Sequence, residues 1–204
     1  MNDRQAISIA VLTTNQDDVE LINGTLRDGG HAAHCHWVRQ PEAFDALLAR
    51  DPVELVIVHC ERYPDTIRQV IRQKDAYAPE VHVIAVSQSI DEAAIDKALH
   101  QGACDLVSIT KRSRLQAVVD RELRAFRVEQ ALNSTLQSAT GYRKQLDDYM
   151  QGSASAIAYV QEGIITELNR AWLALFRGKD KDELQGLPLM DHFEAESQAA
   201  IKGA

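Results

Sequence analysis

The sequence predicts an α/β fold in which a doubly wound, five-stranded parallel sheet is followed by a long helix and a shorter α+β segment. Short β-rich runs alternate with amphipathic helical patterns through the first half of the chain. The third run, Leu55–Val58, is apolar throughout, and no proline interrupts the helical pattern from Ser113 to Tyr149. Alternating strands and helices form parallel sheets that are covered on both faces, and their central strands are apolar without a break.

The strands are predicted from short apolar runs between turn-forming residues: Ser8–Leu12, Ala33–Val38, Leu55–Val58, Val81–Val86 and Leu106–Ile109. The helices between them are predicted from apolar residues at steps of three and four: Asp17–Gly29, Pro41–Arg50, Tyr63–Tyr77 and Asp91–Gln101. These elements give a first domain over residues 1–112.

A fifth helix is predicted over residues 113–149. Its apolar or small residues recur at helical steps, with an irregular stretch in the middle: Leu115, Val118, Val119, Leu123, Phe126, Leu132, Leu136, Ala139, Leu146 and Met150. A helix of this length cannot bury its seam against one small domain, so the pattern favours a parallel coiled coil, and hence a homodimer, over a solvated linker helix.

The segment over residues 150–204 has a different character. Two strand-like runs flank a tight turn at Glu162-Gly163, and Asn169 opens a short helix, Arg170–Phe176. No further strands follow that could close a sheet, so this segment is expected to be the first part of a domain.

Composition limits the classes of partner. The formal net charge is −8 and the pI is about 5.3, and no basic patch is present, which argues against nucleic acid. No apolar run approaches the roughly 20 residues of a membrane span, so membrane insertion is not expected. The three widely spaced cysteines indicate a reducing, cytoplasmic location with buried thiols.

Four segments between Ile9 and Leu123 resemble the response-regulator receiver domain, a flavodoxin/CheY-like fold with strand order 2-1-3-4-5. They are Val11-Leu-Thr-Thr-Asn-Gln-Asp-Asp-Val-Glu-Leu21, Glu54-Leu-Val-Ile-Val-His59, Val83-Ile-Ala-Val-Ser87 and Gly102-Ala-Cys-Asp-Leu-Val-Ser-Ile-Thr110. The resemblance implies a crevice at the carboxyl ends of the strands, where receivers bind magnesium and accept a phosphoryl group.

That site is degenerate here. Thr13 and Thr14 stand where receivers carry two acids, and His59 replaces the phosphorylated aspartate. Ile109 replaces the lysine, whereas Ser87 keeps the type of the receiver's switch residue; Leu106 takes the aromatic switch position, and Lys111 comes two residues late. Magnesium needs hard, charged oxygens, so we expect no catalytic residue, no metal, no cofactor and no enzymatic activity.

Two alternatives for this region remain. Phosphate could still be carried by His59, or by a displaced acid such as Glu61 or Asp65, whereas Asp17 and Asp18 are expected to cap the first helix. The cluster His31, His34, Cys35 and His36 could suggest a metal site. On a strand, however, His34 and His36 face one way and Cys35 the other, so an exposed edge strand explains the cluster better.

The segment from about Leu146 to His192 is similar to the first half of a PAS domain. The similarity rests on Ala156-Ile-Ala-Tyr-Val160, Gly163-Ile-Ile165, Asn169-Arg-Ala-Trp172 and Glu183-Leu-Gln-Gly-Leu-Pro-Leu189. A PAS pocket can enclose haem, flavin or a metabolite, but Trp172 and Phe176 are interpreted as core residues.

A degenerate receiver, a signalling helix and a PAS segment, in this order, resemble the amino-terminal region of FimX-like proteins. The resemblance implies a bacterial regulator that continues into degenerate GGDEF and EAL domains and acts in cyclic-di-GMP control of type IV pili and twitching motility. It also implies a homodimer, a protein partner of a signalling or pilus pathway, and a cytoplasmic, polar location.

The sequence therefore predicts a non-catalytic regulatory and dimerisation module. Its dimer or partner surface is expected along the fourth and fifth helices: Ile95, Leu99, Leu115, Val119, Leu123, Phe126, Leu132 and Leu136. The alternative is a small-molecule sensor that binds its ligand in the receiver crevice or in the complete PAS domain and shifts the dimer.

Overall fold

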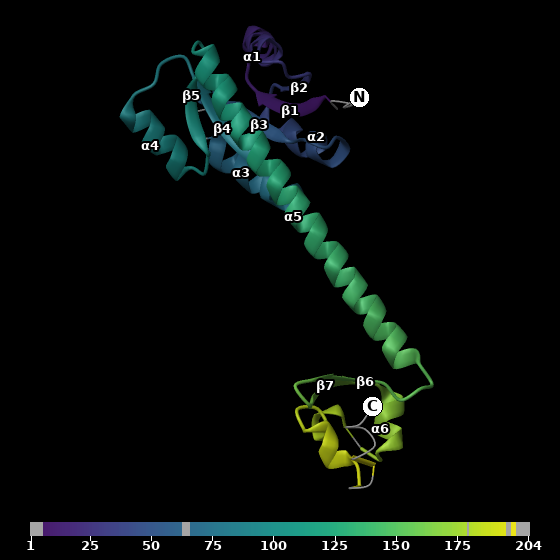
Figure 1. Cartoon of the computed structure of the whole chain (residues 1–204). Coiled ribbons are helices and arrows are strands. Elements are labelled where there is room, and N and C mark those ends of the chain that lie inside the picture. The colour runs from purple at the N-terminus through teal and green to yellow at the C-terminus, as the bar shows by residue number, and fades with distance from the viewer. Residues whose placement is uncertain (1–5, 63–65, 179, 195–196, 199–204) are drawn as a thin grey trace. The chain divides into compact units, whose positions relative to one another are not determined.

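The computed structural model describes residues 6–62, 66–178, 180–194 and 197–198 (Figure 1). The chain divides into two compact units, Met1–Asn133 and Ser134–Ala204, and the division falls within the long helix α5. Among the described residues, no helix combines the length and the apolar character that a membrane-spanning helix needs.

The first unit is built on a five-stranded parallel sheet in the order β2-β1-β3-β4-β5, which confirms the predicted fold class. The strands are β1 (Ile7–Leu12), β2 (Ala33–Val38), β3 (Leu55–His59), β4 (His82–Ser87) and β5 (Asp105–Ser108). Every residue of the central strand β3 is buried, as its unbroken apolar run predicts. Strand β2 lies at an edge of the sheet.

The helices of this unit are α1 (Gln16–Asp28), α2 (Phe44–Arg50), α3 (Thr66–Tyr77), α4 (Glu92–His100) and α5 (Arg112–Gly152). A 3-10 turn, η1 (Pro41–Ala43), precedes α2 because proline starts a helical turn well but lacks the N–H that a helix interior needs. The predicted start of α3 at residues 63–65 lies outside the described residues.

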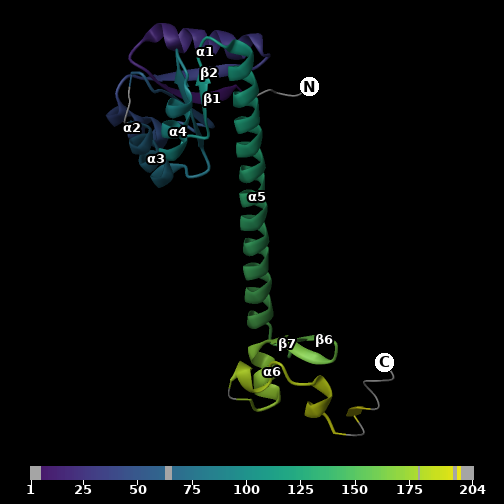
Figure 2. The same cartoon turned by 90° about the vertical axis from the view of Figure 1, so that its left-hand side faces the viewer.

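The helices cover both faces of the sheet, as Figures 1 and 2 show. Ile22 of α1 and Leu115 of α5 pack with Ile9, Ile57 and Ile84 in one apolar layer. Residues of α2, α3 and α4 pack against alternate residues of the same strands in the second layer: Phe44, Leu47, Ile67, Val70 and Ala98. Alternation along each strand thus supplies both layers.

Part of the predicted partner surface is wrong. Leu115, Val119, Leu123 and Phe126 are buried in the core of their own unit. The first three face the sheet beside α1, and Phe126 joins the layer formed by α2, α3 and α4. These side chains are apolar because they close the sheet, so they are not available to a second molecule.

The remaining residues of that predicted surface are at least partly accessible. Ile95 is partly buried against the core, and Leu99 is 45% exposed. Every residue over 127–149 of α5 is exposed, including Leu132 and Leu136. Gly141 does not interrupt the helix.

The second unit contains a hairpin of β6 (Ala158–Gln161) and β7 (Ile164–Leu168), the short helix α6 (Arg170–Leu175), and two 3-10 turns, η2 (Lys181–Glu183) and η3 (Leu189–His192). The predicted turn at Glu162-Gly163 is present, and both of its residues have positive φ, which a two-residue hairpin turn of this type requires. Buried Asn169 caps α6 by accepting from the Trp172 N–H at 2.9 Å.

Trp172 and Phe176 lie with their ring centroids 4.8 Å apart and pack against the small apolar core formed by Ile165, Leu168 and Leu184. Their position in this core agrees with the interpretation of both as core residues.

Candidate functional site: the crevice at the carboxyl ends of the strands

The strand register brings the predicted crevice residues to one edge of the sheet. Thr13 follows β1, His59 ends β3, Ser87 ends β4 and Ile109 follows β5. His59 pairs with Val86, and Ser87 pairs with Ser108, so the strands end at the same level. Thr13, His59, Ser87 and Ile109 are all buried, whereas Thr14 is exposed at the start of the loop to α1.

Asp18 supplies a carboxylate that the sequence prediction did not place here. It is 6% exposed, and its Oδ2 accepts a 2.6 Å hydrogen bond from the Thr13 hydroxyl. The expectation that Asp17 and Asp18 cap α1 is wrong for the cap itself, because the Asn15 side chain accepts from the Asp17 N–H at 3.1 Å. One turn of helix then directs Asp18 back toward the sheet.

His59 is enclosed beside this carboxylate. It is 1% exposed, its Nε2 lies 3.7 Å from Asp18 Oδ2, and neither ring nitrogen has a hydrogen-bond partner among the described residues. Burial lowers the pKa of His59 below its ordinary 6.5, although the carboxylates of Asp18 and Glu61 act in the opposite direction. The imidazole is therefore neutral at physiological pH.

Glu61 organises the other side of the crevice. Its Oε1 accepts hydrogen bonds from the Ser87 hydroxyl at 2.6 Å and from the N–H groups of Gln88 and Ser89 at 3.0 and 3.1 Å. The bonds from Ser87 and Ser89 hold the pKa of Glu61 below its ordinary value, against the effect of burial. The carboxylate thus acts as a fixed acceptor that ties the end of β3 to the loop after β4.

A pocket of about 270 Å³ opens between this loop and α4. Glu61, Ser87, Lys97, Gln101 and Leu106 are among its lining residues. Leu106, at the position where receivers keep an aromatic side chain, contributes an aliphatic wall.

The crevice holds two carboxylates, and the expectation that it holds none is corrected. Both are occupied by internal contacts, Asp18 with Thr13 and Glu61 with Ser87 and the following loop. The position of the receiver lysine carries the apolar side chain of Ile109, which is 2% exposed. Asp65, the other displaced acid considered, lies outside the described residues.

The histidine-rich strand β2 fits the edge-strand interpretation. The rings of His34 and His36 lie 4.4 Å apart on one side of the strand, and His36 Nε2 lies 3.0 Å from the Ser8 hydroxyl. Cys35 packs against the core on the other side. The expectation of buried thiols holds in part, because Cys35 and Cys60 are partly buried and Cys104 is exposed.

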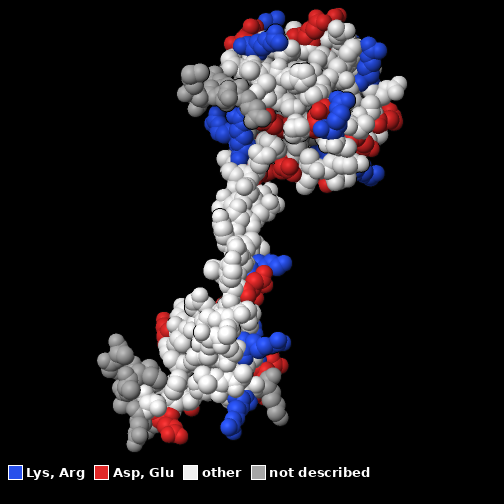
Figure 3. Space-filling model, turned by 90° about the vertical axis from the view of Figure 1, so that its right-hand side faces the viewer, with Lys and Arg blue, Asp and Glu red and all other residues white. Residues whose placement is uncertain are grey.

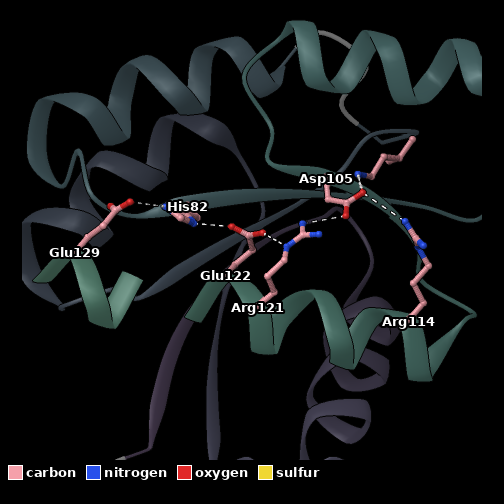
Figure 4. A network of polar contacts seen from close by, with 7 residues as sticks. His82, Asp105, Arg114, Arg121, Glu122 and Glu129 are labelled. Atoms are coloured by element: carbon pink, nitrogen blue, oxygen red, sulfur yellow. Dashed lines mark hydrogen bonds and ion pairs between the residues drawn. The ribbon is translucent and has the colours of Figure 1, made fainter. Parts of the chain in front are cut away.

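A second polar cluster, which sequence reasoning missed, lies at the other end of the strands, where β4 begins. His82 Nδ1 lies 2.6 Å from Glu122 Oε2, and Glu122 Oε1 accepts a 2.7 Å bond from Arg121 Nε (Figure 4). The sequence pattern places His82 in a strand and Glu122 in a helix but does not predict that they meet. Because 40 residues separate them, no local motif indicates the pair.

No protein-family model matches the chain, and no curated protein matches it. Solved structures of receiver domains do resemble it. A response regulator from Thermotoga maritima is 20% identical with a TM-score of 0.50, and the likeness covers 59% of this chain and 99% of that one. The receiver domain of a putative LuxO repressor protein from Vibrio parahaemolyticus is 15% identical with a TM-score of 0.52, over 63% and 98% of the two chains.

NtrX from Brucella abortus, solved in complex with ADP, is 23% identical with a TM-score of 0.54. The likeness covers 74% of this chain and 36% of NtrX. At these identities the likenesses show that the first unit has the receiver fold.

Proposed function

We propose that this chain is a non-catalytic regulatory and dimerisation module of a signal-transduction protein, whose receiver-like unit signals by contact and takes no phosphoryl group at the usual position. The observation that carries the proposal is His59. A buried, neutral imidazole occupies the place of the phosphorylated aspartate.

The chemistry of phosphoryl transfer supports this reading. The reaction depends on a divalent cation and on a fixed positive charge that neutralises the equatorial oxygens. Asp18 is already bonded to Thr13, Glu61 is bonded to Ser87 and the following loop, and Ile109 offers no charge. Magnesium would have to displace these internal bonds, and no lysine stands at the receiver position to neutralise the phosphoryl oxygens.

The exposed part of α5 supports dimerisation through a coiled coil. From Ala125 to Tyr149, apolar or small uncharged residues alternate at steps of three and four: Ala125, Val128, Leu132, Thr135, Ala139, Tyr142, Leu146 and Tyr149. All but Ala125 are exposed, and Leu132 is 57% exposed. This is the heptad spacing of two-stranded coiled coils.

The charge distribution on α5 points the same way. Residues 130–142 include no charged side chain. On the face seen in Figure 3, the exposed stretch of the helix is correspondingly uncharged over much of its length. A single helix surrounded by water normally carries many charged side chains. We therefore infer that a second copy of the chain packs against this stretch.

The finer part of the proposal follows the FimX-like resemblance. A degenerate receiver, a long helix and a hairpin with a short helix would form the amino-terminal part of a regulator of cyclic-di-GMP signalling, type IV pili and twitching motility. The second unit would be the first part of a PAS domain. A pilus or signalling protein would be the partner, with a cytoplasmic, polar location.

The crevice is tested by adding magnesium with beryllofluoride, or with a small phosphodonor, to the chain. We expect no labelling and no change in mass distribution or thermal unfolding. Alkali- and hydroxylamine-labile labelling that disappears in Asp18→Asn or Glu61→Gln would show that a displaced acid accepts phosphate and would overturn the proposal.

Dimerisation is tested by sedimentation of the chain and of Leu132→Glu and Leu146→Glu. Charges at the seam should convert a dimer to a monomer. The matched control Gln137→Glu adds the same charge on the opposite side of the helix and should leave the dimer intact. A monomeric wild-type chain at micromolar concentration would contradict the coiled coil.

The pocket between the loop after β4 and α4 supports the alternative of a small-molecule sensor. Its 270 Å³ lies just below the usual size range of ligand pockets, so it fits only a small ligand. A saturable rise in melting temperature with a metabolite, lost when Ala98→Phe fills the pocket, would favour this function over signalling by contact alone.

A further inference from the structure

Three groups that commonly bind metals converge where β4 and β5 begin. His82 opens β4, Cys104 comes directly before β5, and Glu122 lies on α5. One ligand atom from each lies within 4.8 Å of the other two. Because Ser87 ends the same strand that His82 begins, this cluster is about 17 Å from the crevice along β4.

The neighbours of the cluster orient its potential ligand atoms. His82 Nδ1 faces Glu122, whereas His82 Nε2 lies 3.7 Å from Glu129 Oε1 (Figure 4). A metal-bound histidine commonly donates its other ring N–H to a carboxylate, which fixes the tautomer and the ring orientation. Glu129 lies beyond hydrogen-bond distance of Nε2, and a small shift would let it accept the Nε2 proton once a metal replaced the contact between Nδ1 and Glu122.

Glu122 is held in a similar way. Its side chain is 7% exposed, Arg121 Nε bonds its Oε1 at 2.7 Å, and Asp105 holds Arg121 at 3.0 Å. The other oxygen, Oε2, faces His82 Nδ1 at 2.6 Å. The imidazole and the carboxylate therefore each direct one atom toward the other, and the second oxygen of Glu122 is held by Arg121.

We propose that His82 Nδ1, Cys104 Sγ and Glu122 Oε2 form a binding site for a divalent transition metal of the zinc type, with Glu129 and Arg121 as positioning residues. Nitrogen, thiolate and carboxylate ligands suit zinc, and three protein ligands leave a fourth position for water. Cys104 is exposed, so the site is accessible from solvent.

Binding releases the thiol proton of Cys104 to solvent. It also displaces the proton by which His82 Nδ1 bonds Glu122 Oε2, and it leaves the bound imidazole with a single proton on Nε2. Two anionic ligands and a neutral imidazole then neutralise the cation. The ligands come from β4, from the residue before β5 and from α5, so metal would join α5 to the sheet and stabilise the first unit by mass action.

An ion-pair network without metal is the competing explanation, and Cys104 separates the two. The ion pairs and hydrogen bonds among His82, Glu122, Arg121 and Asp105 do not pass through Cys104, although its thiol contacts Glu122. A structural network therefore predicts no effect of Cys104 on metal binding.

The test is a cobalt titration of the full chain, followed by competition with zinc. Tetrahedral cobalt with a thiolate ligand shows visible ligand-field bands and a near-ultraviolet charge-transfer band. We expect both bands at one cobalt per chain, with displacement by zinc. Cys104→Ala should abolish the charge-transfer band, whereas the matched control Cys60→Ala should retain it.

Affinity gives a second readout. Glu129→Gln should weaken zinc binding by about 10–100-fold, the usual effect of a lost outer-shell carboxylate. His82→Gln should weaken it further, and zinc should raise the melting temperature of wild type but not of Cys104→Ala. Absence of the cobalt bands, or equal zinc affinity in wild type and Cys104→Ala, would overturn the proposal.

Discussion

The two stretches of α5 share one residue pattern and have opposite surroundings. In the first, Leu115 to Phe126, apolar side chains at helical spacing are buried against the sheet. In the second, Val128 to Tyr149, apolar side chains at the same spacing are exposed. The pattern therefore predicts that this face of the helix is buried, but it does not predict which surface buries it.

The two stripes also lie on different sides of the helix. A stripe through Leu115, Val119 and Phe126 would continue at Glu129 and Asn133, which are polar. The second stripe instead starts one residue earlier, from Ala125, which rotates it by about 100°. Traced back by seven residues from Ala125, the second stripe reaches Val118, which is buried, so this stripe borders the buried face and becomes exposed from Val128 onward.

The largest expected effect compares Leu123→Ala with Leu132→Ala. Leu123 is 2% exposed, so its truncation should lower the free energy of unfolding of the first unit. The expected loss is about 2–5 kcal/mol. Leu132→Ala, measured by urea unfolding at a dilution where the chain is monomeric, should change it by less than about 0.5 kcal/mol.

Sedimentation of the same two variants completes the test. Leu132→Ala should weaken the dimer, whereas Leu123→Ala should weaken folding. Equal losses of unfolding free energy in the two monomeric variants would mean that the second stripe is covered within the chain, and the comparison would fail.

A smaller effect compares two threonine hydroxyls. Thr13 donates to Asp18 inside the crevice, and Thr140 donates to the Leu136 carbonyl on the exposed stretch of α5. Thr13→Val leaves a buried carboxylate without its donor and should cost about 1.5–3 kcal/mol. Thr140→Val should cost less than about 0.5 kcal/mol, because water replaces the bond. Similar costs in thermal or urea unfolding would mean that Asp18 is better hydrated than its burial indicates.

The fold could be predicted because its signals are local and redundant. The apolar run Leu55–Val58 needs burial on both faces, and the hairpin turn at Glu162-Gly163 needs positive φ. Each signal therefore predicts the local backbone without information from distant parts of the chain. The crevice residues Thr13, His59 and Ser87 were placed together because parallel strands end at one edge.

The remaining features depend on tertiary contacts. Asp18 was expected at the helix end because Asp favours caps, but Asn15 takes that role and the next turn points inward. The His82–Glu122 contact depends on how α5 crosses the sheet, which periodicity does not specify. Leu115 and Val119 were assigned to a partner because core and interface use the same side chains.

The seam can be strengthened as well as broken. Ala139 lies in the second stripe, and Ala139→Leu would add apolar carbons from each helix to the interface, at about 0.8 kcal/mol per buried CH₂. We expect the dimer to tighten by at least about tenfold, which corresponds to 1.4 kcal/mol. Gln137→Leu adds an apolar side chain on the opposite side and should leave the dimer constant unchanged in sedimentation equilibrium. Equal tightening by both variants would indicate nonspecific association.

The smallest effect concerns how the stability of the first unit depends on pH through the buried side chain of His59. Burial lowers the pKa of His59 from 6.5, despite the opposing charges of Asp18 and Glu61, and Arg62 acts with burial. Below pH 6.5 the imidazole of His59 therefore binds a proton in the unfolded chain but not in the folded chain. Its contribution to the free energy of unfolding is present above pH 6.5 and is lost as the pH falls toward the pKa of the folded state. His59→Leu should remove this component, so the stability of wild type relative to the variant should decline from about pH 7.5 to pH 5. Asp18→Asn removes the carboxylate that raises this pKa and should steepen the decline. If the difference in stability between wild type and His59→Leu does not change with pH, the imidazole titrates in the folded chain as it does in water.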